Sequence, residues 1–187
     1  MSQRARWWLG VGLLTVVGTG LAFIRHSAAE GPSRKNAANS LKAEPAALER
    51  TRKQVRMLDD IYKTAVVLIT DKYVDDADDF PAGSAAVALF AAIKQKGWHE
   101  ARLLDVTGQP HEEKNAAQTD FEKAAVQAIK GGKNYYEQVV EIDGQPHLQA
   151  ATPIPVVSKK CTLCHPHYAD VKDGQAIGAI GYTIRIE

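Results

Sequence analysis

Cysteine is scarce in this sequence, with two residues among 187, so a metal site made of four thiolates is excluded. An excess of charge of one sign is absent as well, because 23 lysines and arginines stand against 22 aspartates and glutamates. The net charge of +1 gives no sign of a nucleic-acid surface, and we expect no nucleic-acid partner. Nucleophile motifs, metalloprotease helix motifs and phosphate-cradling loops are missing. We therefore expect a protein that is not an enzyme.

The two cysteines stand three residues apart, as Cys161 and Cys164, and His165 follows directly. This Cys-x-x-Cys-His pattern is typical of a c-type haem attachment site. In such a site the two thiols add to the two vinyl groups of one haem, and the histidine offers an imidazole nitrogen to the iron. The pattern therefore predicts one covalently bound haem c, with Cys161 and Cys164 as attachment points and His165 as an axial iron ligand.

Three other interpretations of the cysteine pair compete with haem attachment. A thioredoxin-like dithiol opens a helix in a βαβ unit early in a domain, whereas this pair comes late, after Lys159 and Lys160. A structural zinc ion needs four ligands, so His165, His167 or a distant histidine has to complete the set. A disulfide between residues three apart closes too small a loop to stabilise much. We interpret the motif as a haem site.

The N-terminus has the pattern of an export signal or a membrane anchor. Arg4 and Arg6 precede an uncharged apolar run over residues 7–24, which is the arrangement of an export signal. The run is close to the length of about 20 residues that spans a bilayer. We predict an uncleaved transmembrane anchor within residues 1–29, with a cleaved signal sequence as the alternative.

The export signal and the cysteine motif support each other, because covalent haem attachment of this type occurs on the outer side of the bacterial inner membrane. We expect a single-pass inner-membrane protein with its haem domain in the periplasm, or a soluble periplasmic protein if the signal is cleaved. Residues 30–43 are polar and lack apolar periodicity, which predicts a linker. Residues 44–187 then form one domain.

Apolar periodicity predicts helices before and between the strands of that domain. The expected elements are a helix from about 45 that the acidic cluster 75–79 ends, a helix over about 82–96, a strand over 99–106, a helix from about 120 that Gly131 and Gly132 stop, strands over 135–142 and 147–157, and a strand over 176–186. This order predicts an α+β fold in which helices cover one face of an antiparallel meander. The motif joins the last two strands, so we expect the haem between the sheet and a helix. Gly178 and Gly181 of the last strand either allow the haem to approach the backbone closely or mark a bulge or weak point in the strand.

Several segments go beyond this general pattern: Gly97–Asp105, Asp120–Ala124, Tyr135–Glu137, Ala150–Val157 and Cys161–Tyr168. Together they resemble single-haem, PAS-like domains of exported bacterial proteins and of the extracytoplasmic part of membrane receptors. The resemblance covers about residues 45–187 and implies a PAS-like antiparallel sheet with long N-terminal helices, one covalent haem, and electron transfer or sensing. Some members use a cysteine of the early helix as sixth iron ligand, whereas both cysteines of this chain are in the motif.

His99 is the leading candidate for the sixth iron ligand, because it lies in a predicted strand beside Trp98. The alternatives are a vacant or water-occupied position and the side chains of His111, His147, His167 and Met57. Histidines near turns are expected to face solvent, and a methionine on a helix packs in a core more often than it binds metal. A methionine ligand raises the redox potential relative to a second histidine, whereas an open position permits binding of a small gas. Arg102 is a candidate partner of a haem propionate, with an exposed strand arginine as the alternative.

The expected function is that of a membrane-tethered monohaem c-type cytochrome that exchanges single electrons with a redox partner protein. The alternative is a haem-based module for redox or gas sensing that acts through a separate partner. No signalling segment follows the haem domain in this sequence, which favours electron transfer. A peroxidase-like enzyme is a third interpretation, and it requires an open distal side with an acid–base residue. No pattern in the sequence indicates an oligomeric state.

Overall fold

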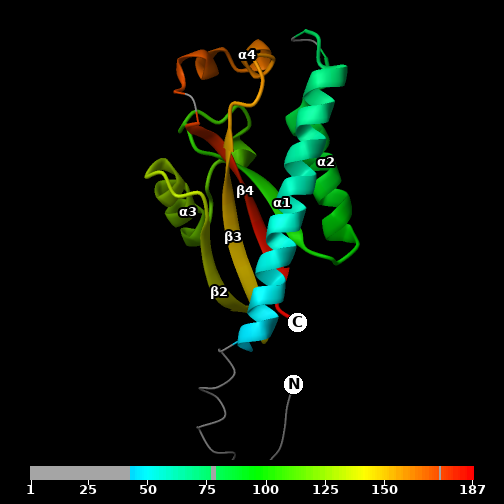
Figure 1. Cartoon of the computed structure of the whole chain (residues 1–187), viewed down its shortest axis with the longest axis vertical. Coiled ribbons are helices and arrows are strands. Elements are labelled where there is room, and N and C mark those ends of the chain that lie inside the picture. The colour runs from blue at the N-terminus through cyan, green and yellow to red at the C-terminus, as the bar shows by residue number, and fades with distance from the viewer. Residues whose placement is uncertain (1–42, 77–78, 173) are drawn as a thin grey trace, which may run out of the picture. The chain divides into compact units, whose positions relative to one another are not determined.

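A computed structural model describes residues 43–76, 79–172 and 174–187 of the chain (Figure 1). These residues fall within one of the two units of the chain, residues 34–187. The predicted anchor over 1–29 lies outside the described residues, as does all but the last residue of the predicted linker. Within the described ranges, no helix combines the length and the apolar character that crossing a membrane requires.

Two long helices precede the sheet: α1, Pro45–Tyr73, and α2, Ala82–Gln95. The carboxylate of Glu44 caps α1, because it accepts hydrogen bonds from the N–H groups of Ala46 and Ala47 at 3.1 and 2.8 Å. These groups have no partner inside the helix, so a side-chain acceptor just before the first turn stabilises it. Both predicted helices are confirmed, and α2 ends one residue earlier than expected.

The other elements are β1 (Glu100–Asp105), α3 (Asp120–Lys130), β2 (Tyr136–Ile142), β3 (Gln145–Pro155), α4 (Cys161–Cys164), β4 (Ala176–Arg185) and the 3₁₀ helices η1 (Glu113–Asn115) and η2 (Pro166–Asp170). Of these, the predicted elements β1, α3, β2, β3 and β4 match the structure to within two residues at each end, whereas α4, η1 and η2 were not predicted. Asp143 and Gly144 both have positive φ, 51° and 72°. Left-handed conformations at both central residues make the tight hairpin turn that aspartate followed by glycine favours.

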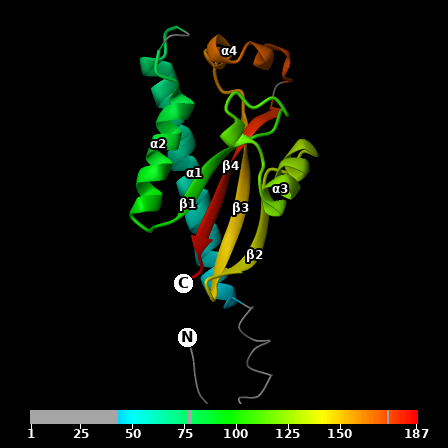
Figure 2. The same ribbon diagram turned by 180° about the vertical axis from the view of Figure 1, so that it is seen from behind.

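The four strands form one antiparallel sheet in the order β1-β4-β3-β2. Strands β2, β3 and β4 follow one another as the predicted meander. Strand β1 pairs with β4, however, so the strand that comes last in sequence lies inside the sheet (Figures 1 and 2). The predicted α+β class and antiparallel sheet are confirmed, and the motif connects β3 to β4 at one end of the sheet.

Helices cover both faces of this sheet, so the prediction of a single covered face is wrong. Strand alternation sends Ile180 and Tyr182 toward a core with α1 and α2, and it sends Ala179 into a second core with α3. Figures 1 and 2 show α1 and α2 to one side of the sheet and α3 to the other. Helix α3 has its own apolar stripe, and burying that stripe requires a face that α1 and α2 leave free.

Asp59 ties α1 to the sheet. Its carboxylate accepts hydrogen bonds from the Thr152 hydroxyl at 2.5 Å and from the Tyr182 hydroxyl at 2.9 Å, and it pairs with Lys63 at 2.7 Å. Burial, followed by the charge of Asp59, raises the pKa of Tyr182, so its hydroxyl stays protonated and donates. A carboxylate this close to the core is tolerated because Thr152, Tyr182 and Lys63 all donate hydrogen bonds to it.

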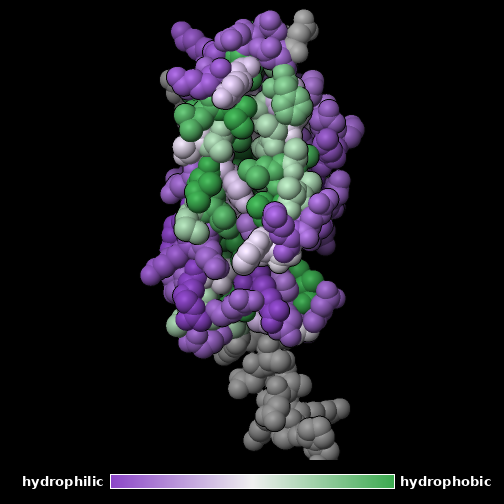
Figure 3. All heavy atoms as spheres, turned by 90° about the vertical axis from the view of Figure 1, so that its right-hand side faces the viewer, coloured by the Kyte–Doolittle hydropathy of each residue, from purple (hydrophilic) through white to green (hydrophobic). Residues whose placement is uncertain are grey.

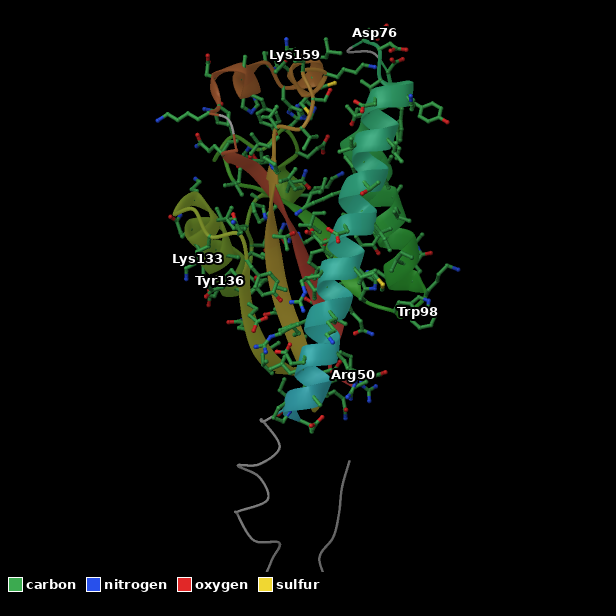
Figure 4. The ribbon with its side chains drawn as sticks, viewed as in Figure 1. Arg50, Asp76, Trp98, Lys133, Tyr136 and Lys159 are labelled. Atoms are coloured by element: carbon green, nitrogen blue, oxygen red, sulfur yellow. The ribbon has the colours of Figure 1, made fainter. Side chains whose placement is uncertain are left out.

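Apolar side chains also lie on the outer side of α1 and α2. Met57, Ile61 and Leu68 of α1 are each more than half exposed, and Leu89 of α2 is 40% exposed. Figure 3 shows apolar residues gathered over the upper part of this face. Figure 4 shows Trp98, which follows α2, pointing away from the domain. Met57, considered above as an iron ligand, therefore lies on the solvent side of its helix.

Candidate functional site

The cysteine motif folds into a single helical turn, α4, that is closed by backbone hydrogen bonds. The Cys161 N–H donates to the Ser158 carbonyl, and the His165 N–H donates to the Cys161 carbonyl, both at 3.1 Å. Residues one turn apart share a side of a helix, which places Cys161 and Cys164 next to each other with His165 adjacent. Both thiols are free and half-buried. Pro166 then begins η2, so the turn cannot extend.

A cavity of about 380 Å³ lies beside this turn. It sits between the two long helices and the sheet face that they cover, at the end where β1 and β3 stop and β4 starts. Its wall is largely apolar and includes Val66, Val67, Ala82, Leu103, Ile154 and Ile180. Cys161, Cys164 and His165 form part of the same wall. The structure thus brings the three motif residues together on one apolar cavity between sheet and helices.

The His165 imidazole is held by aromatic neighbours. Tyr168 stacks on it with ring centroids 4.6 Å apart, and His111 meets it edge-on at 5.2 Å. Burial lowers the pKa of His165, and the nearby His111 and His167 lower it further, which favours the neutral imidazole that binds metals. Its Nδ1 is buried and has no hydrogen-bond partner. A buried nitrogen without a partner next to two free thiols fits a site that a larger group completes.

Arg102, predicted to meet a propionate, lies on the other side of the sheet. Side chains alternate along a strand, so Leu103 reaches the cavity while Arg102 points to the α3 face. There its guanidinium pairs with Glu122 at 2.9 Å and donates to the carbonyls of Lys114 and Ala116. Arg102 is therefore a brace between β1, α3 and the loop that joins them, and it does not line the cavity.

His99, predicted as the sixth ligand, lies before the first residue of β1, whereas the cavity lies at the other end of that strand. Asp105 on the cavity wall is six positions beyond His99 along the strand, a span of roughly 20 Å. The Nε2 of His99 is 2.8 Å from the Tyr62 hydroxyl, and burial lowers the pKa of the imidazole. The structure places His99 in a hydrogen bond within the domain and does not bring it to the cavity.

The two glycines of β4 play different roles. Gly178 lines the cavity, and a Cβ there would lie 3.1 Å from the carbonyl oxygen of Leu104. Gly181 is not on the cavity wall, and a Cβ there would meet the Leu104 side chain at 3.3 Å. The expected close approach of a haem to the strand backbone is therefore possible only at Gly178 of the two glycines. Gly181 instead leaves room for the Leu104 side chain of the neighbouring strand β1.

The Gly178→Ala variant is expected to lower the free energy of unfolding by about 1–3 kcal/mol, because the added methyl group presses on strand backbone that cannot move away. Urea denaturation followed by circular dichroism measures the change. Gly83→Ala is a matched control on the same cavity wall, since its nearest atom is 3.8 Å away. That variant should be neutral or stabilising by up to about 1 kcal/mol. Equal stability of the two variants contradicts the packing argument.

A protein-family model matches residues 28–183 of the 187. The chain belongs to the Tll0287-like family. A search among curated proteins returned no match. The matched range contains the motif, both long helices and nearly the whole sheet, so the cavity is built entirely from residues that the family model covers.

The zinc interpretation finds no cluster to support it in the part of this Tll0287-like chain that the structure describes. No group of three or more histidine, cysteine, aspartate or glutamate side chains there is close enough to hold a metal ion. A structural zinc ion needs four such ligands. Of the other histidines, His147 donates from Nδ1 to the Gln145 carbonyl, 2.9 Å away, and His167 packs on Tyr168 without reaching the cavity wall.

Sequence reasoning missed two features of the cavity in this Tll0287-like domain. His111 was expected to face solvent, yet its ring contacts His165 and forms part of the wall. Lys63, Lys114 and Lys160 also line the cavity. No local pattern marks these residues, because they come from a loop, a helix and a strand connection that only the tertiary fold brings together. The loop position of His111, one residue after Pro110, was the sole local hint, and it pointed to solvent.

Proposed function

We propose that this Tll0287-like protein is a single-haem c-type cytochrome that transfers one electron at a time. In this proposal Cys161 and Cys164 hold the haem through thioether bonds and His165 is an axial ligand. The observation that carries the proposal is the coincidence of the motif with the cavity: the chain's two cysteines and the adjacent histidine open onto its apolar wall. When bound there, haem supplies the one-electron chemistry of its iron.

The residues around the cavity have definable tasks in this proposal. The helical turn α4 sets the two sulfur atoms on one side, and the stacked Tyr168 ring fixes the orientation of His165. Val66 and Val67 of α1 and Ile154 of β3 exclude water from the iron, which limits side reactions and helps to set the redox potential. The protein thus supplies attachment, orientation and a dry surrounding.

The lysines on the wall are the proposed partners of the haem propionates, in place of Arg102. Lys63 already pairs with Asp59 at 2.7 Å, and Lys160 pairs with Asp75 at 3.1 Å. Lys114 is less engaged, since the carboxylate oxygen paired with it is 3.7 Å away. A cation with a weak partner is the one that gains most from a new carboxylate, so Lys114 is the first candidate.

The setting proposed for this cytochrome follows from the N-terminal sequence. The basic start and the apolar run over 7–24 favour an anchor in the bacterial inner membrane, with the haem domain in the periplasm. The resemblance to PAS-like haem domains supports a PAS-like sheet, and a separate redox protein is the proposed electron partner. The alternative to an anchor is a cleaved signal and a soluble periplasmic protein.

Haem-based sensing is the second candidate function. The observation that favours it is the apolar character of the cavity wall that α1 and α2 contribute, where Val66, Val67 and Ala82 offer no iron ligand. An iron with a free position on that side would bind a small gas. Carbon monoxide distinguishes the two functions: a reduced spectrum that carbon monoxide leaves unchanged supports electron transfer, and a shifted one supports sensing.

The proposal is tested by producing the full chain in a bacterial host that matures c-type cytochromes. We expect coloured protein whose mass exceeds that of the polypeptide by one haem, with a Soret band that shifts on reduction. The double variant Cys161→Ala, Cys164→Ala is the control, and it should be colourless with the mass of the bare polypeptide. A colourless wild-type protein of bare polypeptide mass refutes the assignment.

A further inference from the structure

We propose that His111 is the second axial ligand of the iron, an inference that rests on the haem function proposed above. His111 lies in the loop between β1 and α3, far from His165 in sequence, yet both imidazoles belong to the wall of one cavity. Their ring centroids are 5.2 Å apart and their planes are nearly perpendicular, at 79°. The fold therefore presents two imidazoles to the same space from two separate segments.

The separation of the two rings is close to what one iron requires. A metal–imidazole bond is about 2 Å long, so two imidazoles on opposite sides of a metal have their nitrogens roughly 4 Å apart and their centroids somewhat farther. The observed distance of 5.2 Å between centroids calls for a parting of the rings on the order of one ångström. His111 is outside the strands and helices, so its backbone has no ladder of hydrogen bonds that resists such a shift.

Other nitrogen and sulfur donors in the described residues are engaged or absent from the wall. His99 bonds to Tyr62, and His147 is at the far end of β3. Met57 is exposed on the outer side of α1, and both cysteines belong to the motif. The lysines on the wall are the proposed partners of the propionates. His167 also lies beside His165, with ring centroids 5.9 Å apart, but it is not on the wall. Among the described histidines other than His165, His111 alone is on the cavity wall.

The loop that carries His111 is braced by the residue that sequence reasoning assigned to a propionate. Arg102 donates to the carbonyls of Lys114 and Ala116, three and five residues beyond His111. The same guanidinium forms an ion pair with the Glu122 carboxylate of α3. This brace holds the loop at Lys114 and Ala116, and it leaves the backbone of His111 itself outside the braced residues. Arg102 is thus a positioning residue for the loop that carries His111, and the haem need not touch it.

Ligation by two histidines has a consequence for function. An iron with both axial positions filled by imidazoles is six-coordinate, and carbon monoxide has to displace a ligand before it can bind. The proposal therefore favours electron transfer over gas binding for this chain. It also assigns a redox potential below that of a histidine–methionine cytochrome.

The test compares His111→Ala with wild type, both as full-length haem protein. We expect a low-spin spectrum for wild type. In the variant we expect high-spin bands, a carbon monoxide adduct of the reduced form, and a return to low-spin bands when free imidazole is added. His99→Ala and His147→Ala are the matched controls, and each should keep the wild-type spectrum. His111→Met offers a thioether in the same place and should give a low-spin spectrum with a raised potential.

Two results overturn the proposal: a His111→Ala variant that keeps the low-spin spectrum, and a wild-type protein that is already high-spin. Both leave the haem function standing, because the protein is still coloured and still carries the mass of one haem. Colourless wild-type protein refutes the haem function itself. If His111→Ala is recovered without haem, the His111→Met variant tests the proposal instead. A His111→Met spectrum identical to that of wild type would show that residue 111 does not bind the iron.

Discussion

The His165→Ala variant is expected to lose the wild-type haem spectrum, which is the largest effect of any single substitution proposed for this protein. His165 follows the second cysteine of the motif directly and lies on the cavity wall, so α4 sets its place relative to both thiols. Its ring is stacked on Tyr168, and burial lowers its pKa, so the imidazole is oriented and neutral before haem binds. Optical spectra of the oxidised and reduced protein measure the effect.

The control for this variant is His147→Ala, which also removes an imidazole. His147 lies near the start of β3, whereas the cavity lies at the other end of that strand. That protein should have Soret and visible bands identical to those of wild type. Unchanged bands in His165→Ala would show that the iron takes its ligand elsewhere, and the axial assignment would then be abandoned. Changed bands in both variants would indicate that loss of any histidine perturbs the fold.

The Glu122→Ala variant is expected to lower the free energy of unfolding by about 3 kcal/mol. It removes the carboxylate that pairs with Arg102 and that accepts hydrogen bonds from backbone N–H groups at the start of α3. The Glu122 side chain is 9% exposed and pairs with Arg102 at 2.9 Å. It also accepts from the N–H groups of Gln118 and Thr119 at 2.7 and 3.1 Å. For a domain of this size the loss corresponds to a fall in Tm of roughly 6–12 °C.

Urea denaturation of the two proteins, each with the same haem content, measures this loss. Gln127→Ala is the matched control, since Gln127 is exposed on the same helix and its change should stay within about 0.5 kcal/mol of wild type. A Glu122→Ala protein as stable as the control contradicts the brace. If His111 is a ligand, the same variant should also broaden the low-spin spectrum, because the loop that Arg102 holds is no longer fixed.

The helices and strands of this chain could be predicted closely, because each is encoded by a local period. Helix α1 shows apolar residues at helical spacing after a proline, and it starts near residue 45 and ends before the acidic cluster 75–79, as predicted. Strand pairing is different, because it depends on contacts between distant segments. No local pattern says that β1 pairs with β4, or that α3 (Asp120–Lys130) takes the opposite face from α1.

The candidate site shows the same division between local and tertiary information. Cys161 and His165 could be predicted as candidate haem-binding residues from spacing alone, since that pattern is local in the chain. The sequence also predicts that the side chains of Arg102 and Leu103 point to opposite faces of β1, because side chains alternate along a strand. Only the tertiary structure shows which of the two faces lines the cavity. His111 lies in a loop without periodicity, so its contact with His165 could not be anticipated.

The order of the strands bears on how the protein matures. Strand β4 lies between β1 and β3 in the sheet but follows the cysteine motif in sequence. During synthesis the thiols of Cys161 and Cys164 therefore emerge before β4, the strand that contributes to both cores. Until β4 inserts, β1 has no partner strand in the sheet. Under the haem function proposed above, the thiols would thus be open to attachment before this late strand completes the domain.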